Sequence, residues 1–302
     1  ALTLETPFPE PPAPGAWAEV APGLHWARLA LPFRLDHVNV YALEDAGGWA
    51  LVDAGIANGA TRAAWEALLA APPLSGGGVG RVVVTHHHPD HIGLAGWLCE
   101  RTGAPLLTSR TAFLTATAFT EAPGLLEAEE FRRFYASHGM RPEAAALVAT
   151  QGHAYLRMLS PLPRSYERLV AGDRLALGGR RWEVLSGDGH APEQLMFLSG
   201  DLFLSADQVL ERISPNVSLL AFEPKGDPLG EFLRSLDALA ARVPEGALVL
   251  PGHRLPFRGL HERAAQLKAH HAARCDRIWE ACDAPRTADD LVPVLFTRPL
   301  DP

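Results

Sequence analysis

Four histidines and one aspartate occupy six consecutive positions in the stretch Thr85-His86-His87-His88-Pro89-Asp90-His91. The stretch follows the β-branched run 81–85, which is typical of a strand, and leads into residues 91–101, whose apolar positions have helical spacing. Loops between a strand and a helix often carry binding and catalytic residues. We therefore expect a functional loop in a βαβ unit, with an exposed histidine-rich loop or part of a tag as the alternatives.

The spacing of these residues suits metal coordination. His86 and His88 are two positions apart, so both imidazoles project to the same side of an extended segment. Asp90 and His91 come next and can face a second point as the chain turns into the helix. Imidazole and carboxylate groups without a thiolate favour a catalytic site for zinc, manganese or iron over a structural cysteine-type zinc site. His87 is the surplus histidine, which we expect to point away from the metal or to support a ligand.

Residues of ligand type also follow three later apolar runs, each of which is typical of a short strand. They are His190, Asp207 and His253. Strand ends in a sandwich meet at one edge, so these side chains are able to converge with the histidine-rich loop. None of them would be decisive alone, but their combination with the loop predicts a site for more than one metal ion.

Two regions of the chain are helical in pattern and lack strand-like runs. The first is an insert at about residues 111–163, which we expect to cover the metal edge as lids do. The second is the C-terminal segment, residues 261–302. We predict one large domain over residues 16–260 that contains the insert, followed by the C-terminal helical segment.

The overall composition limits the function classes. The 302 residues are 47% hydrophobic, as in a folded globular chain, and carry a formal charge of −8, which gives no general attraction for nucleic acid or an anionic membrane. Nucleic acid is not excluded, because one cluster of basic residues can form a local basic surface. The cluster comprises Arg254, Arg258, Arg263 and Lys268. Three cysteines without paired spacing, no secretory signal and no apolar run of ~20 residues lead us to expect a cytoplasmic protein.

The order of the motifs HxHxDH, GH, Asp and PGH resembles the metallo-β-lactamase fold superfamily of hydrolases. The resemblance covers about residues 17–260 and implies an α+β fold, an αββα four-layer sandwich with the metals on one edge. It implies that one metal is held by His86, His88 and His190, and the other by Asp90, His91 and His253, with Asp207 bridging. Asp53, in the strand end Leu51-Val52-Asp53-Ala54-Gly55, is implied to orient a ligand histidine.

Asp201 is an alternative to Asp207 as the bridging residue. The bridging position of the superfamily often reads Gly-Asp, which Gly200-Asp201 matches. The same dipeptide, however, joins the apolar runs 194–199 and 202–206 and predicts a two-residue hairpin turn. Asp201 would then lie at the opposite end of the strands from the ligands. We therefore predict Asp207.

The resemblance implies a metal-dependent hydrolase in which a bridging hydroxide on a dinuclear site attacks the substrate. We expect zinc, with iron(II) or manganese(II) as alternatives, and a catalytic role for Asp90. The expected substrate is a small carbonyl compound such as a thioester or another ester, as in the glyoxalase II-like branch. A metal-dependent RNase or phosphodiesterase and a non-catalytic binding module are the alternatives.

Other residues are weaker candidates for contact with a substrate. His37 lies near the early strands, and Tyr135 and Tyr155 lie in the helical insert. For each of them, ordinary packing or exposure is the alternative interpretation. The histidines and arginine within residues 261–274 suggest a solvated helix face, with a contact to a second copy of the chain or to substrate as the alternative. A homo-oligomer is left open.

Overall fold

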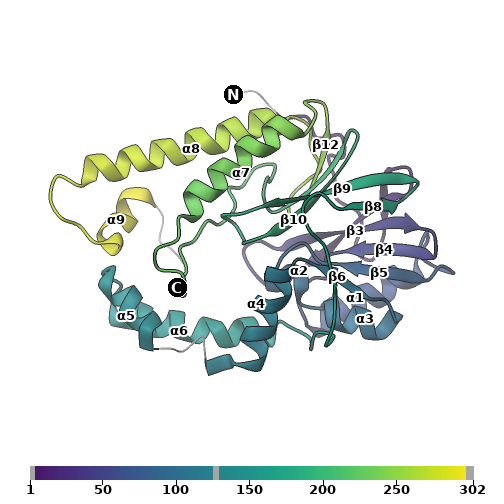
Figure 1. Ribbon diagram of the computed structural model, residues 1–302, viewed down its shortest axis with the longest axis horizontal. Helices are drawn as coiled ribbons and strands as arrows, with labels where there is room; N and C mark the ends of the chain where they lie inside the picture. Colours follow the sequence, from purple (N-terminus) through teal and green to yellow (C-terminus); the bar gives the residue numbers. More distant parts are fainter. Residues whose placement is uncertain (1–3, 125–128, 297–302) are drawn as a thin grey trace.

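Two β-sheets pack face to face in the computed structural model, which describes residues 4–124 and 129–296 (Figure 1). The first sheet has seven strands in the order β1-β2-β3-β4-β5-β6-β7, and the second has five in the order β12-β11-β10-β9-β8. The strands of the first sheet are β1 (Ala18–Ala21), β2 (Leu24–Ala30), β3 (His37–Asp45), β4 (Gly48–Val52), β5 (Val79–Val83), β6 (Leu106–Thr108) and β7 (Glu167–Arg168). Those of the second are β8 (Arg174–Leu177), β9 (Arg180–Gly187), β10 (Gln194–Ser199), β11 (Leu202–Ala206) and β12 (Leu248–Pro251).

The first sheet brings the histidine-rich loop and Asp53 to one edge. β4 and β5 are parallel, with Val52 opposite Val83, so the chain leaves both strands on the same side. The backbone N–H of Asp53 donates to the carbonyl of Val83 at 2.8 Å. Asp53 therefore lies beside the loop 85–91, which follows β5.

The second sheet brings Asp207 and His253 to one edge. β10 and β11 form an antiparallel hairpin in which Ser199 is opposite Leu202, so Gly200-Asp201 is the turn. β11 and β12 are parallel, so the residues that follow both strands leave the sheet at the same edge. Asp201 lies at the opposite end of β11 from Asp207, as the hairpin pattern predicts.

Three buried apolar clusters divide the molecule into four layers. Trp26 of the first sheet and Trp182 of the second lie in the cluster between the sheets, and each is at most 1% exposed. Trp65 lies in the cluster between the first sheet and its helices, and Phe232 in the cluster between the second sheet and its helices. The covering helices are α1 (Gly59–Ala70), α3 (Ala95–Thr102), α7 (Pro228–Arg242) and α8 (Leu260–Ala281). The predicted αββα sandwich is confirmed.

The helix predicted over residues 91–101 is interrupted. α2 (Pro89–Ile92) is followed by a turn at Gly93 before α3 begins. The backbone N–H of Leu94 donates to the carbonyl of Gly55 at 2.9 Å, and a Cβ on Gly93 would lie 2.6 Å from that oxygen. The prediction of one continuous helix was wrong because a contact with a distant loop, which the local apolar spacing does not reveal, breaks it.

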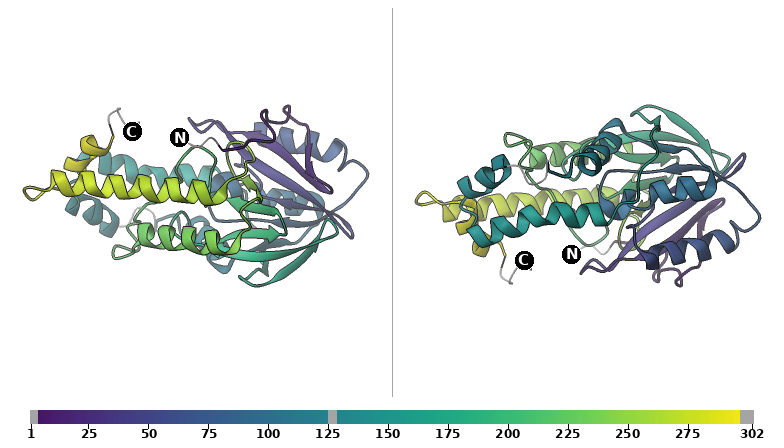
Figure 2. Two further views of the ribbon diagram at one scale, coloured as in Figure 1. Left: turned by 90° about the horizontal axis from the view of Figure 1, so that it is seen from above. Right: turned by 90° about the horizontal axis from the view of Figure 1, so that it is seen from below.

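The insert and the C-terminal segment are helical and extend from the same end of the sandwich (Figure 2). The helices within the insert are α4 (Arg110–Glu121), α5 (Glu129–Ser137) and α6 (Pro142–Arg157), and α9 (Ala288–Leu295) follows α8. The two regions meet at their tips, where the backbone N–H of Asp289 donates to the carbonyl of His138 at 3.4 Å. None of the described helices has the length and apolar character needed to cross a membrane.

Candidate metal centre

Imidazole nitrogens from two sheets converge at the shared edge of the sandwich. Nδ1 of His88 lies 3.0 Å from Nε2 of His86 and 3.0 Å from Nε2 of His190. The Nε2 atoms of His86 and His190 are 3.3 Å apart. His86 and His88 come from the loop after β5, and His190 from the loop after β9. We call these three residues the histidine group.

A second group combines carboxylates with imidazoles. Nε2 of His253 lies 3.3 Å from Oδ2 of Asp90 and 3.1 Å from Oδ2 of Asp207. Oδ2 of Asp207 is also 3.4 Å from Nε2 of His91 and 3.4 Å from Nε2 of His190. Asp207 therefore reaches both groups, whereas Asp201 lies at the other end of β11.

The donor atoms of the two groups fit divalent cations. Potential ligand atoms lie within 4.8 Å of one another in three overlapping sets. The sets are His86–His88–His190, His86–His91–Asp207 and Asp90–His91–His253. Among the described residues, Nε2 of His91 and Oδ1 of Asp207 are buried without a hydrogen-bond partner, which is costly unless a ligand or an ion contacts them. The structure thus brings together all the residues that the sequence pattern predicts as ligands.

The second ring nitrogen of several histidines is held by the protein. Nδ1 of His91 lies 2.7 Å from a carboxylate oxygen of Asp53, and Nδ1 of His253 lies 2.7 Å from the carbonyl oxygen of His37. Nδ1 of His190 lies 2.8 Å from the carbonyl oxygen of Asn216. Such contacts fix the tautomer and the ring orientation of a metal-binding histidine and leave the other nitrogen for the metal.

The surrounding charges set the protonation of these groups. Burial, together with the neighbouring imidazoles, holds the pKa of His86 and His88 well below the usual value, so both rings are neutral at neutral pH and have a lone pair to donate. Burial also lowers the pKa of His253, but the carboxylates of Asp207 and Asp90 outweigh it and raise the pKa to about 10. Without a metal, protonated His253 balances the carboxylates, a role that a bound divalent cation would take over.

Backbone conformation near the centre is strained. Three non-glycine residues that flank it, Asp53, Ala206 and Arg254, have φ angles of 65°, 46° and 70°. Such left-handed conformations are costly for most side chains and are found often at functional sites. Gly252 is required for a different reason, because a Cβ there would lie 2.2 Å from Oδ1 of Asp207.

The weaker candidates occupy different places. His37 is buried beside the centre, where Nε2 accepts a hydrogen bond from the backbone N–H of Arg254 at 2.9 Å. The hydroxyl of Tyr155 donates to the carbonyl of His87 at 2.6 Å, so α6 contacts the histidine-rich loop. Tyr135 is half-buried on α5, and its ring packs against Phe134. His87 is itself buried and contributes to none of the three ligand sets described above.

The basic residues considered for nucleic acid are mostly engaged by the protein. The guanidinium of Arg263 is largely buried and donates to the carbonyl oxygens of Leu210 and Ile213. Lys268 pairs with Asp237, and Arg258 donates to the carbonyl of Gly246. These contacts do not favour a free basic surface.

Some supporting groups were missed from the sequence, because they belong to the backbone. The backbone carbonyl of Asn216 holds His190, and a backbone group leaves no trace in residue type. Only the fold places this carbonyl beside the ring.

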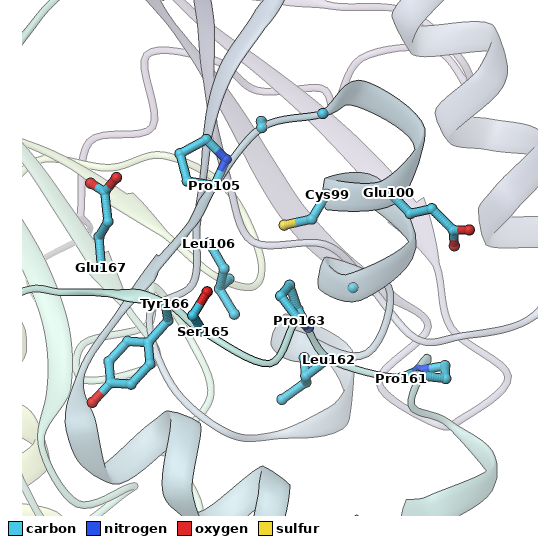
Figure 3. Close-up of a pocket in the computed structure, with 13 residues that line it drawn as sticks. Cys99, Glu100, Pro105, Leu106, Pro161, Leu162, Pro163, Ser165, Tyr166 and Glu167 are labelled. Carbon is cyan, nitrogen blue, oxygen red and sulfur yellow. The ribbon is translucent and has the colours of Figure 1, made fainter.

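A hollow of about 530 Å3 lies at the amino ends of the parallel strands, away from this edge (Figure 3). It lies between α3 and the segment 161–167, and none of its lining residues is a histidine. Burial raises the pKa of the Cys99 thiol to about 12, so this group is protonated at neutral pH and is a poor nucleophile. The hollow lacks the chemistry of the metal centre.

Comparisons with known proteins agree with this fold. Residues 33–253 match the family model described as the Metallo-beta-lactamase superfamily. The chain is 25% identical over 248 residues to the probable metallo-hydrolase YqjP of Bacillus subtilis (strain 168), which covers 76% of this chain and 71% of that protein. It is also similar to the crystal structure of a beta-lactamase domain protein from Burkholderia ambifaria, with 37% identity and a TM-score of 0.85, over 97% of this chain and 88% of that one. A metallo-beta-lactamase family protein from Thermus thermophilus has 34% identity and a TM-score of 0.79, over 93% of this chain and 89% of that one.

The fold, the motif order and the match over most of the chain define the class of protein. The chain belongs to the metallo-beta-lactamase superfamily. It is a hydrolase of this superfamily.

Proposed function

We propose that the protein is a dinuclear metal-dependent hydrolase that cleaves a small carbonyl substrate, a thioester or another ester. The observation that carries this proposal is the position of Asp207. One carboxylate oxygen lies within 3.4 Å of ligand nitrogens from both groups, as expected for a residue shared by two cations. The name of the relative YqjP, a probable metallo-hydrolase, supports the same chemistry.

The donor set supports zinc as the metal, with iron(II) or manganese(II) as alternatives. Imidazole and carboxylate groups without thiolates are typical of catalytic zinc sites. Two bound divalent ions would supply Lewis acidity and make hydroxide available from a shared water at neutral pH. In this assignment the histidine group holds one ion and Asp90, His91 and His253 hold the other.

Asp90 is proposed to have a catalytic role in addition to metal binding. Its side chain is 20% exposed, whereas that of Asp207 is 7% exposed, so Asp90 faces the solvent side of the centre. Burial raises the pKa of Asp90, but His91 and His253 outweigh burial and hold the pKa at about 2. The ionised carboxylate is able to accept a hydrogen bond from the attacking water and orient it towards the substrate carbonyl.

The proposal is tested with a panel of thioesters, lactones, β-lactams and phosphodiesters. Metal-loaded protein is compared with protein treated with a chelator, and metal content is measured in parallel. We expect about two metal ions per chain and metal-dependent turnover of a thioester or another ester. Turnover confined to phosphodiesters would favour the RNase or phosphodiesterase alternative, and full turnover after the metal is removed would contradict the mechanism.

A further inference from the structure

A cavity separate from the hollow beside α3 lies next to the metal centre, between α8 and the loop that joins β11 to α7. Its volume is about 490 Å3, within the range of ~300–1,000 Å3 that is usual for small-molecule sites. Residues 214–217 form one wall. His270, His271 and Arg274 of α8 form another, and Phe296 lies at one side.

The α8 wall of this cavity is basic. The guanidinium of Arg274 stacks on the ring of Phe296, with 4.6 Å between the guanidinium carbon and the ring centroid. Within residues 4–124 and 129–296, no carboxylate forms an ion pair with Arg274, His270 or His271, and Nε2 of His271 is buried without a hydrogen-bond partner. Burial and the nearby Arg274 lower the pKa of both histidines, so their rings are neutral at neutral pH and offer N–H donors, while Arg274 carries the charge.

Arg274 differs in its contacts from the other basic residues of α8. Lys268 is paired with Asp237, and Arg263 is bonded to backbone carbonyls. Arg274 forms no ion pair with a carboxylate in the described part of the chain, and its guanidinium lies over the ring of Phe296. In a chain with a formal charge of −8, a guanidinium without a carboxylate partner, beside imidazole N–H donors, is complementary to an anion.

We propose that this cavity binds an anionic group, a phosphate or a carboxylate, carried by the substrate. The cavity and the metal centre share a wall. Asn216, which lines the cavity, holds Nδ1 of His190 through its carbonyl oxygen at 2.8 Å. The ring of His271 packs edge-on against Phe232, 5.6 Å away, and Phe232 in turn packs close to Gly189, the residue before His190. Anion binding stands by itself, whereas assigning the anion to the substrate rests on the proposed hydrolase function.

Calorimetric titration of the metal-loaded protein with inorganic phosphate and with succinate tests anion binding. We expect wild type to bind one of these anions, and the tighter of the two identifies the class. Arg274→Ala should weaken that binding at least about tenfold, because a charge-assisted hydrogen bond is lost, and the matched variant Lys268→Ala should change it by less than about twofold. No binding by wild type, or equal binding by wild type and Arg274→Ala, would overturn the proposal.

Two further variants separate the cavity from the metals and from folding. Asp207→Ala removes the proposed bridging ligand. If this variant still binds phosphate, and that binding is weakened when Arg274→Ala is added, the phosphate is bound in the cavity. Loss of the dependence on Arg274 in that background would show that the metals bind the anion, and the proposal would be wrong. His271→Gln keeps Arg274 and should also weaken binding, which provides a second measurement if Arg274→Ala does not fold.

A separate measurement of KM tests whether the bound anion is part of the substrate. For a thioester or ester found in the substrate panel, a version with a phosphate or carboxylate should show a raised KM in Arg274→Ala, with kcat little changed. The neutral version should show no change in KM. An equal effect on both versions would overturn the assignment to substrate and leave the titration result unaffected. A chain without any hydrolase activity would contradict only the proposed function.

Discussion

The carboxylate of Asp53 lies 2.7 Å from Nδ1 of His91 and accepts hydrogen bonds from both the backbone N–H and the hydroxyl of Thr85. His91 is fully buried, and its Nε2 faces Oδ2 of Asp207. Asp53 thereby connects β4 to the loop after β5 and sets the direction of one proposed ligand. The carboxylate also increases the basicity of the imidazole towards a metal.

Substitution of Asp53 should weaken metal binding without removing a ligand. Asp53→Asn preserves the shape of the side chain and an acceptor for Thr85, but removes the charge that orients His91. We expect metal affinity to fall by about 10–100-fold, measured by competition with a chromogenic chelator. The control is Asp237→Ala, at an exposed carboxylate on α7, which should leave the affinity unchanged. Equal affinities in Asp53→Asn and wild type would exclude this role.

The two candidate aspartates for the bridging position make a matched pair. Asp207→Ala should lose metal and hydrolytic activity and remain folded, because it removes the carboxylate shared by both groups. Asp201→Ala, in the exposed hairpin turn, should keep about two metal ions per chain and wild-type activity. Metal content is measured by elemental analysis and folding by circular dichroism. Full metal content in Asp207→Ala would refute the bridging role.

The insert should support the metal centre through Tyr155. Tyr155→Phe removes the hydroxyl that donates to the carbonyl of His87 and should lower the free energy of unfolding by about 0.5–1.5 kcal/mol. Tyr135→Phe removes a hydroxyl from the same insert, but from a ring that packs against Phe134 on α5, so its effect should be smaller. Urea unfolding compares the variants. A larger destabilisation in Tyr135→Phe than in Tyr155→Phe would contradict a stabilising role for the hydrogen bond from Tyr155 to His87.

The strands were predictable where apolar runs alternate with turn residues. The runs 194–199 and 202–206, with Gly200-Asp201 between them, match β10 and β11, because a two-residue turn is encoded locally. β1 (Ala18–Ala21) and β7 (Glu167–Arg168) were not predicted, since both are short and β7 has no apolar residue. Their pairing depends on neighbouring strands rather than on their own sequence.

The candidate ligands were predictable because each is a side chain of distinctive chemistry at a strand end. The groups that hold these ligands in place were less predictable. Asp53 was recognised from its motif, but the carbonyls of His37 and Asn216 act through the backbone, which has the same chemistry in every residue. The basic cavity was also hidden, because the residues that line it with Arg274 come from separate segments that only the fold brings together.

Stability should depend on pH through His87, which lies among the proposed ligands without being one. It is buried, its Nδ1 has no hydrogen-bond partner among the described residues, and burial lowers its pKa from 6.5 to about 4. The pKa of His87 is lower in the folded than in the unfolded chain. The free energy of unfolding is therefore unaffected by this residue above pH 6.5 and decreases as the pH falls towards 4, because the unfolded chain binds the proton more readily. Between about pH 7.5 and 5, wild type should therefore lose about 2 kcal/mol more of its unfolding free energy than His87→Phe, which keeps a ring but cannot be protonated. Urea unfolding of both proteins in the presence of a chelator measures this difference, and identical pH dependence in the two proteins would contradict the neutral, buried state of His87.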